Sequence, residues 1–292
     1  MKKFLACLMC CLLLCGCTVS MNGTENNNTT SNITESTTQP STEDNDLAPS
    51  ANTTQAPSAT QLANINDYST SKVIWGPGNI ENHQVPTDPA SLEKSFSSLG
   101  GKWLLDNKNQ VCLTFDEGYE NGFTPSILDT LKEKKVKAIF FVTYDFAKDN
   151  PDLIKRMIDE GHIVGNHTYR HYTMDEIDLD TAKEEVMTLH NYIKKEYNYT
   201  MSYFRFPKGE FSQQSLALVN QLGYKSVFWS FAYADWDTSN PPDNSEALTK
   251  ICESTHPGEI ILLHAVCKTN ADILGSAIDD IRQQGYTFTT EL

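Results

Sequence analysis

Two adjacent carboxylates, Asp116 and Glu117, end an apolar run at residues 111–115 and are followed by a glycine-punctuated loop. Within a strand, neighbouring side chains point to opposite faces. We expect this alternation to be lost at the end of the run, so that both carboxylates turn into one cavity. Two carboxylates in one cavity repel each other unless a cation or a basic partner separates their roles. The pair is therefore the first candidate for a catalytic or metal-binding centre.

Two histidines, His167 and His171, follow with the spacing H-x3-H. One helical turn would place both imidazoles on the same side. With a carboxylate they would form a two-histidine, one-carboxylate site, which suits Zn²⁺ or a similar divalent ion with open positions for water. Two surface histidines would show the same spacing, so the prediction depends on the pair lying beside Asp116 and Glu117.

Arg205 opens the sequence Arg-Phe-Pro-Lys-Gly at residues 205–209. A guanidinium beside a carboxylate lowers the pKa of the carboxyl group, so Arg205 is a candidate partner for a carboxylate that must stay ionised. Pro207 and Gly209 shape the loop that follows, where a backbone N–H could face an oxyanion. A surface ion pair is the alternative for Arg205, and the tyrosine- and phenylalanine-rich run before it argues against this.

His264 ends the most apolar run of the domain, at residues 260–263, and Asp235 stands in the group before it. A histidine titrates near neutral pH and can act as a general acid. A hydrogen-bonded core histidine is the alternative. The candidate walls of a substrate cleft are Tyr119, Phe206 and Trp236.

Strand-like runs alternate with helical stretches from residue 110 onward. Candidate N-caps of the helices are Thr124, Asn150, Asp180 and Ser212, and Pro125 and Pro151 suit first helical positions. The predicted strands span residues 110–115, 137–143, 162–166, 203–206, 225–230, 259–264 and 286–288.

This alternation predicts an α/β domain of parallel βα units. About seven units without a G-x-G-x-x-G sequence favour a distorted (β/α) barrel over a dinucleotide-binding sheet. In such barrels the active site lies at the carboxyl ends of the strands. Five reactive groups end or follow predicted strands here: the Asp116-Glu117 pair, the His167-His171 pair, Arg205, Asp235 and His264. Their positions are hard to explain by packing alone, so we expect them to share one site.

The residues before the alternation divide into three parts. Residues 1–17 combine a charged start, a short apolar run and small residues, as in an export signal. The small residue before Cys17 resembles a bacterial lipobox, which would anchor a lipidated Cys17 on the outer face of the cytoplasmic membrane; an ordinary secretory signal is the alternative. Residues 18–70, rich in Asn, Thr and Ser, are expected to be a disordered tether. Residues 71–107 are expected to pack as an N-terminal extension on a domain at 108–292.

The sequence has a net charge of −15. This acidic balance argues against nucleic-acid binding, which needs basic patches. Beyond the predicted leader the cysteines are Cys112, Cys252 and Cys267, an odd number without metal-ligand spacing, so we expect free thiols. No G-x-S-x-G sequence supports a serine nucleophile.

At its reactive groups the chain resembles the polysaccharide deacetylases of the NodB-homology type, carbohydrate esterase family 4. That family's ordered motifs are T-F-D-D, H-x3-H, R-x-P-x-G, D-x-x-D-W and L-x-H. The resemblance covers about residues 108–292 and implies the family's distorted barrel. The sequence at 114–122 and the Trp75-Gly76 pair are similar to the delta-lactam-biosynthetic branch of spore-forming bacteria, which deacetylates muramic acid in cortex peptidoglycan. The corresponding motifs here lie at 114–117, 167–171, 205–209, 232–236 and 262–264.

The resemblance implies hydrolysis of N-acetyl groups on peptidoglycan glycan strands. Asp116 would be the general base that activates water, and His264 the acid that protonates the leaving amine. Arg205 would hold Asp116 ionised, and Asp235 would support Arg205 or His264. The implied substrate-binding residues are Tyr119, Phe206, Pro207, Lys208, Gly209, Trp236 and Leu262.

The resemblance also implies a divalent metal ion held by His167, His171 and Glu117, with Zn²⁺ expected and Co²⁺ or Mn²⁺ as alternatives. The chain departs from the family motifs twice. Glu117 stands where the family has a second Asp that binds the metal, and Ala232 replaces the first Asp of D-x-x-D-W.

Two other functions are compatible with the sequence. One is deacetylation of N-acetylglucosamine in peptidoglycan or chitin-like chains, or O-deacetylation of xylan. The other is a wall-binding module without catalysis, against which the presence of both Asp116 and His264 argues. We expect an exported monomer that contacts a membrane only through its signal or lipid anchor.

Overall fold

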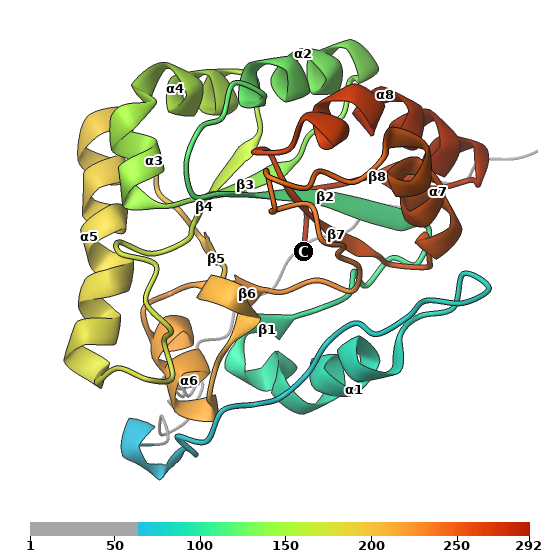
Figure 1. The fold of residues 1–292 in the computed structure, drawn as a ribbon. Coiled ribbons are helices and arrows are strands. Elements are labelled where there is room, and N and C mark those ends of the chain that lie inside the picture. The colour runs from blue at the N-terminus through green and yellow to red at the C-terminus, as the bar shows by residue number, and fades with distance from the viewer. Residues whose placement is uncertain (1–63) are drawn as a thin grey trace, which may run out of the picture. The chain divides into compact units, whose positions relative to one another are not determined.

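A computed structural model describes residues 64–292 of the chain (Figure 1). The predicted export signal with Cys17 and the predicted tether up to residue 63 lie outside the described residues. Within 64–292, no helix combines the length and the apolar character that crossing a membrane requires.

A curled parallel sheet forms the centre of the domain (Figure 1). Its strand order is β1-β6-β5-β4-β3-β2-β7, and β8 pairs with the start of β2. All seven predicted strands are present, several of them shorter than predicted. The strands are β1 (Gly101–Lys102), β2 (Gln110–Glu117), β3 (Ile139–Val142), β4 (Ile163–Asn166), β5 (Tyr203–Phe204), β6 (Lys225–Val227), β7 (Ile260–His264) and β8 (Thr287–Phe288).

The chain beyond β6 closes the sheet into a barrel. Phe231 forms a parallel bridge with Ile261 of β7, and the Leu262 N–H donates to the Phe231 carbonyl at 2.9 Å. Strand β7 is therefore joined both to β2 and to the segment after β6. The predicted distorted (β/α) barrel is confirmed.

Alternate residues of the strands build two apolar clusters. Cys112, Phe141 and Ile260 belong to a cluster made almost entirely of strand residues, which fills the inside of the barrel. Leu113 and Phe115 belong to a larger cluster that includes many helical residues, which places them on the outer face. Because both faces of β2 are buried, this strand appears in the sequence as a continuous apolar run.

Helices cover the outer face of the sheet (Figure 1). Helix α8 packs against both α2 and α7, and α5 packs against α6. The helices are α1 (Thr87–Phe96), α2 (Thr124–Lys134), α3 (Tyr144–Asp149), α4 (Pro151–Asp159), α5 (Leu179–Tyr197), α6 (Gln213–Gln221), α7 (Asn244–Ser254) and α8 (Lys268–Gln283).

Two of the four predicted N-caps are wrong, and Asn150 stands at the N-cap position of α4 without a side-chain cap hydrogen bond. Asp178, two residues before the predicted Asp180, caps α5: the helix begins at Leu179, and the Asp178 side chain accepts from the Thr181 backbone N–H. Helix α2 begins at Thr124 without a side-chain cap, because the Thr124 hydroxyl donates to Glu120 instead. Ser212 caps α6 within a capping box, as predicted.

Residues 71–107 do more than pack on the barrel, because they supply one of its strands. Strand β1 pairs with β6, and the Trp103 ring behind it stacks on Phe228 with a centroid distance of 4.1 Å. Nearer the N-terminus, the Trp75 indole N–H donates to the Gly209 carbonyl at 2.9 Å. This hydrogen bond attaches the N-terminal segment to the loop after β5.

Candidate active site

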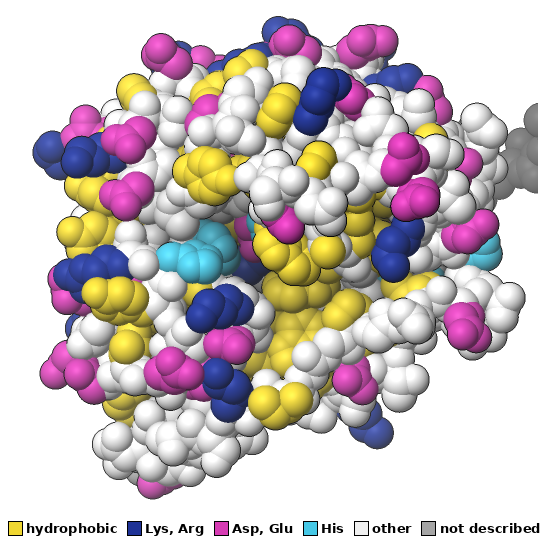
Figure 2. All heavy atoms as spheres, in the orientation of Figure 1, with side chains coloured by type: hydrophobic (Ala, Val, Ile, Leu, Met, Phe, Trp, Pro, Cys, Tyr) yellow, Lys and Arg dark blue, Asp and Glu magenta, His cyan; other side chains and the backbone are white. Residues whose placement is uncertain are grey.

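The carboxyl ends of the strands open into a cleft of about 600 Å³. Asp116 at the end of β2 lies opposite His264 of β7 in the strand register, and His167 and His171 come from the turn after β4. On the face drawn in Figure 2, hydrophobic side chains gather at the centre beside histidine side chains. The cleft is lined by Pro77, Asp116, His167, His171, Lys208, Trp229, Ala232, Tyr233, Ala234, Trp236, Leu262 and His264.

A fully buried arginine holds Asp116 in place. The Arg205 guanidinium donates to Asp116 Oδ1 at 2.9 Å. Its other hydrogen bonds go to the Thr114 hydroxyl and to the carbonyls of Val227 and Phe228. Burial alone would raise the pKa of Asp116, but the charge and hydrogen bond of Arg205, with the charge of His264, outweigh burial and hold this pKa below its usual value. Asp116 is therefore an ionised carboxylate at neutral pH.

The two histidines meet although their segment is not helical. The chain turns sharply after β4, with positive φ at Thr168 (74°) and His171 (60°), in place of the predicted helical turn. The two Nε2 atoms are 3.2 Å apart, and His167 Nε2 lies 3.6 Å from Asp116 Oδ2. His167 Nδ1 lies 2.9 Å from the Arg205 carbonyl. Since a carbonyl only accepts, the His167 proton sits on Nδ1 and leaves the Nε2 lone pair free.

Both imidazoles are neutral at pH 7. Burial lowers the pKa of His167 below its usual value and outweighs the attraction of Asp116. Burial, together with repulsion from His167, lowers the pKa of His171 to about 4. The Nε2 lone pair of His167 is thus available to an electrophile, with the neutral His171 imidazole beside it.

Glu117 does not join the two histidines. Strand β2 remains paired through Glu117, which lies opposite Val142 of β3, so its side chain points to the other face from Asp116. The side chain is fully buried, and neither carboxyl oxygen has a hydrogen-bond partner within residues 64–292. Burial, and then the charges of Glu120 and Asp116, raise the pKa of Glu117 well above its usual range.

This position contradicts the prediction of Glu117 as a metal ligand. The prediction assumed that the strand alternation ends before Glu117, whereas the pairing with β3 maintains it. Across the described part of the chain, no group of three or more His, Cys, Asp or Glu side chains is arranged to hold a metal ion.

Asp235 orients His264. The His264 Nδ1–H donates to Asp235 Oδ1 at 2.7 Å, and the His264 backbone N–H donates to Oδ2 at 2.8 Å. Asn270 of α8 donates to the same Oδ2 at 2.6 Å. Burial alone would lower the pKa of His264, but the hydrogen bond and charge of Asp235 outweigh burial and raise it. Of the two partners left open for Asp235, the structure places it on His264.

Three predicted substrate-binding residues line the cleft, namely Lys208, Trp236 and Leu262. The Trp236 side chain is 57% exposed, and its ring lies edge-on to His264 at 6.1 Å between centroids. Tyr119 is exposed but is not among the lining residues.

The other three predicted substrate-binding residues shape the loop after β5 without lining the cleft. Phe206 is fully buried and stacks on Phe228, so the prediction of a cleft wall is wrong for this residue. Pro207 and Gly209 are buried too, and a Cβ on Gly209 would lie 2.5 Å from the Trp229 ring. The aromatic packing behind this loop therefore decides its position.

Sequence reasoning missed Pro77, Trp229 and Tyr233 as cleft residues and Asn270 as a partner of Asp235. Tyr233 had a local signal, since it stands two residues before Asp235. Pro77 and Asn270 had none, because they reach the site only through the folding of distant segments.

Known proteins with similar sequences identify the family of this chain. A profile of the polysaccharide deacetylase family matches residues 106–227, which contain the first three reactive groups. The peptidoglycan-N-acetylmuramic acid deacetylase PdaA of Bacillus subtilis is 43% identical over 224 residues, which are 74% of this chain and 83% of that protein. The chain belongs to the polysaccharide deacetylase family.

The solved structure of Bacillus subtilis PdaA, a family 4 carbohydrate esterase, has the same fold as this polysaccharide deacetylase. The TM-score is 0.72 at 39% identity, over 76% of this chain and 95% of that chain. The peptidoglycan-N-acetylglucosamine deacetylase of Bacillus cereus is 31% identical over 204 residues, 68% of this chain and 72% of that protein. The predicted family and the predicted class of enzyme, a deacetylating hydrolase, are confirmed.

The family implies a divalent metal ion, and the histidine pair fits two of its ligands. Two nitrogens bound to one tetrahedral zinc ion at about 2.0–2.1 Å would lie roughly 3.3 Å apart, and the two Nε2 atoms lie 3.2 Å apart. Both imidazoles are neutral, as metal binding requires, and the Arg205 carbonyl fixes the His167 tautomer. Glu117 does not fit as the third ligand.

Proposed function

We propose that this polysaccharide deacetylase hydrolyses the N-acetyl groups of muramic acid residues in peptidoglycan. One observation carries the chemistry: an ionised Asp116 and a proton-holding His264 are register partners that face one cleft. Amide hydrolysis needs a base that takes a proton from water and an acid that protonates the leaving amine. The choice of muramic acid is supported by the identity to the N-acetylmuramic acid deacetylase of Bacillus subtilis.

Asp116 acts as the base through Oδ2. Oδ1 is occupied by Arg205, whereas Oδ2 accepts no hydrogen bond from the described residues and lies 3.6 Å from His167 Nε2. Water loses a proton to Oδ2 as its oxygen bonds to the acetyl carbon. A divalent ion on the two histidines, when bound, supplies Lewis-acid polarisation of the acetyl carbonyl.

His264 acts as the acid. Its Nδ1–H is committed to Asp235, so Nε2–H is the proton available to the substrate. This proton passes to the amide nitrogen as the carbon–nitrogen bond breaks, which releases acetate and leaves a free amine on the sugar. The Asp235 carboxylate stabilises the imidazolium form until then.

Asp116→Asn tests this assignment. We expect kcat/KM for acetate release from glycan strands freed of peptides to fall at least ~100-fold, the lower end for loss of a general base. Circular dichroism should report an unchanged fold, since the amide still accepts from Arg205. Near-normal activity in this variant would contradict the assignment of Asp116 as the general base.

Chelation of the wild-type protein tests the metal. We expect activity to be lost on rigorous chelation and restored by added Zn²⁺, while unaffected activity would refute metal assistance.

Mass spectrometry of the digested product separates muramic acid from the rival substrate N-acetylglucosamine, because the acetyl mass is lost from different sugars. A wall-binding module without catalysis would bind strands but release no acetate at any metal concentration.

We also propose that the protein is exported and anchored through Cys17. The charged start, short apolar run and small residues of 1–17 support this. Membrane fractionation of a Cys17→Ser variant tests it, because retention of that variant in the membrane fraction would contradict a lipid anchor.

A further inference from the structure

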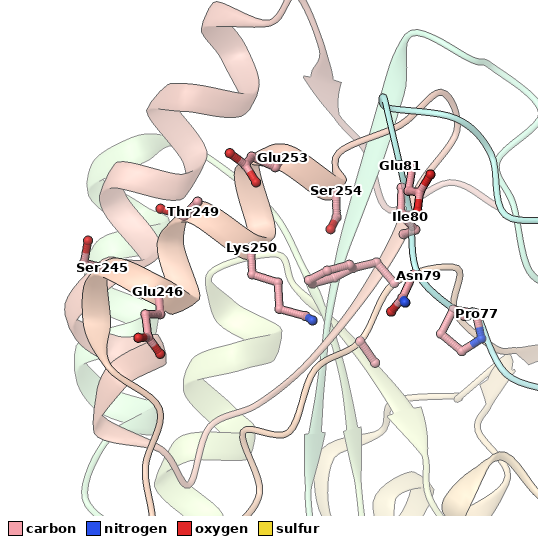
Figure 3. A pocket seen from close by; sticks show the side chains of 13 residues that line it. Pro77, Asn79, Ile80, Glu81, Ser245, Glu246, Thr249, Lys250, Glu253 and Ser254 are labelled. Atoms are coloured by element: carbon pink, nitrogen blue, oxygen red, sulfur yellow. The ribbon is translucent and has the colours of Figure 1, made fainter.

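A second pocket adjoins the catalytic cleft. Its volume is about 620 Å³, and it lies between the N-terminal segment at 77–81 and helix α7 (Figure 3). Pro77 and Ala232 line both this pocket and the cleft. The two hollows are therefore neighbours with a shared wall, and a polymer held in the cleft has the second pocket beside it.

Lys250 is the one Lys or Arg among the residues that line the second pocket. Its side chain extends from α7 toward the N-terminal segment on the opposite wall (Figure 3). Lys155 and Lys268 each pair with a carboxylate one helical turn away. Glu246 offers Lys250 the same opportunity one turn earlier on α7, yet Lys250 forms no ion pair or side-chain hydrogen bond within residues 64–292. The ammonium group is therefore free for a ligand.

The other lining groups suit a sugar. Glu81, Glu246 and Glu253 place carboxylates at the pocket, and Asn79 adds an amide. The carboxylates accept hydrogen bonds from sugar hydroxyls, and the amide both donates and accepts. Because the carboxylates of Glu81, Glu246 and Glu253 repel anions, Lys250 is the one lining residue that can attract an acidic group.

Ala232 lies where the pocket meets the cleft. Its alanine side chain places no charge at this junction. A carboxylate here would repel an acidic group of the substrate close to the reacting bond. The uncharged Ala232, with the unpaired Lys250 beyond it, leaves this side of the cleft open to an anionic substituent.

We propose that Lys250 binds the lactyl carboxylate of muramic acid, which makes the second pocket a subsite that recognises the acidic sugar of the strand. Muramic acid differs from glucosamine by this ether-linked acid, and the carboxylate is free where no peptide is attached. It belongs either to the reacting sugar or to the next muramic acid along the strand. This inference rests on the proposed function.

The test is Lys250→Gln in the full-length protein. On glycan fragments with free lactyl carboxylates we expect KM to rise about fivefold, as for loss of a solvent-accessible ion pair, with kcat unchanged. On the same fragments with methyl-esterified carboxylates, wild type and variant should have equal KM. An unchanged KM on the free acid would overturn the inference.

Glu253→Gln is the matched control, since it removes the opposite charge from the same pocket and helix. The KM of this variant for the free acid should fall or stay the same. A rise equal to that of Lys250→Gln would overturn the inference, because disturbance of the helix would then explain both.

Fragments with one or two muramic acids identify the source of the carboxylate. A Lys250 effect on the single-muramic fragment assigns it to the reacting sugar, and an effect on the longer fragment alone assigns it to the neighbour.

Failure of the inference can be told from failure of the proposed function. Acetate release from muramic strands by the wild type, with KM independent of Lys250, would refute the inference and keep the function. No acetate from muramic acid would refute the function. Calorimetric titration of the free-acid fragment into the wild type and Lys250→Gln would then still measure the inference, because equal affinities would overturn it and weaker binding by the variant would support it.

Discussion

Asp235 sets the pH range over which His264 holds its proton. It raises the pKa of His264 against the effect of burial, so the acid form persists to higher pH. For Asp235→Asn we expect the alkaline limb of the kcat/KM profile to move to lower pH and activity at pH 8 to fall more than ~10-fold. Asp237→Asn, an exposed carboxylate in the same loop, is the control and should leave the profile unchanged.

The Asp235–His264 hydrogen bond also makes the stability of the fold depend on pH. Because the folded pKa of His264 is raised, the stabilisation is complete below the unfolded pKa of about 6.5 and is lost as pH rises through the folded value. The difference in Tm between wild type and Asp235→Asn should therefore be larger at pH 5.5 than at pH 9.

The activity profile has its own contradicting outcome. If the alkaline limb of the kcat/KM profile does not move in Asp235→Asn, Asp235 has no part in holding the His264 proton.

Glu117 gives a prediction opposite to that of the family resemblance. Its carboxyl group is buried without a hydrogen-bond partner in the described chain, and burial raises its pKa, so it folds in the protonated form. This stabilising protonation is complete below the unfolded pKa and is lost as pH rises through the folded pKa. We expect Glu117→Gln to keep wild-type activity and zinc affinity and to gain Tm relative to wild type as pH rises.

Titration calorimetry with Zn²⁺ and melts at pH 5 and pH 8 measure these effects. Glu133→Gln, exposed on α2, is the control and should show no such pH dependence. Loss of zinc binding in Glu117→Gln would restore Glu117 as a ligand and would require its side chain to turn to the other face.

At the scale of elements, the loop after β5 depends on the aromatic rings packed against it. Gly209 has φ of 71°, and an added Cβ would lie 2.5 Å from the Trp229 ring, which lines the cleft. For Gly209→Ala we expect a loss of about 2–3 kcal/mol in the free energy of unfolding from backbone strain and overpacking. We expect kcat/KM to fall as well, because Trp229 and the Arg205–Asp116 pair flank the loop.

Thermal melts and acetate release measure the two effects. Gly76→Ala is the matched control in the attached N-terminal segment, because a Cβ there meets no atom within 4 Å. A Gly209→Ala protein as stable and active as Gly76→Ala would show that the loop relaxes without cost.

At the scale of the whole molecule, closure of the barrel creates the two hollows. The bridge between Phe231 and Ile261 brings the chain after β6 to β7, and the hydrogen bond from Trp75 to the Gly209 carbonyl attaches the N-terminal segment to the loop after β5. The second pocket then forms between that segment and α7, although residues 77–81 and Lys250 are far apart in sequence. The lining of both hollows therefore includes segments outside the five family motifs.

The sequence alone determined which elements form and which of their ends carry reactive groups. Apolar runs, caps and glycines act within a few residues, so the strand–helix alternation and the placement of Asp116, His167, Arg205 and His264 at strand ends were predictable. The family followed from the order of these groups. Local rules were insufficient where competing interactions decided the outcome, as at Thr124 and at the turn that holds His171.

Only the tertiary structure decided how the reactive groups face one another. Pairing of β2 with β3 kept Glu117 on the opposite face from Asp116, and the docking of α8 brought Asn270 to Asp235. The free ammonium of Lys250 beside the cleft likewise appears only after folding. Side-chain direction and neighbours at these positions depend on contacts between segments distant in sequence, which neither periodicity nor spacing encodes.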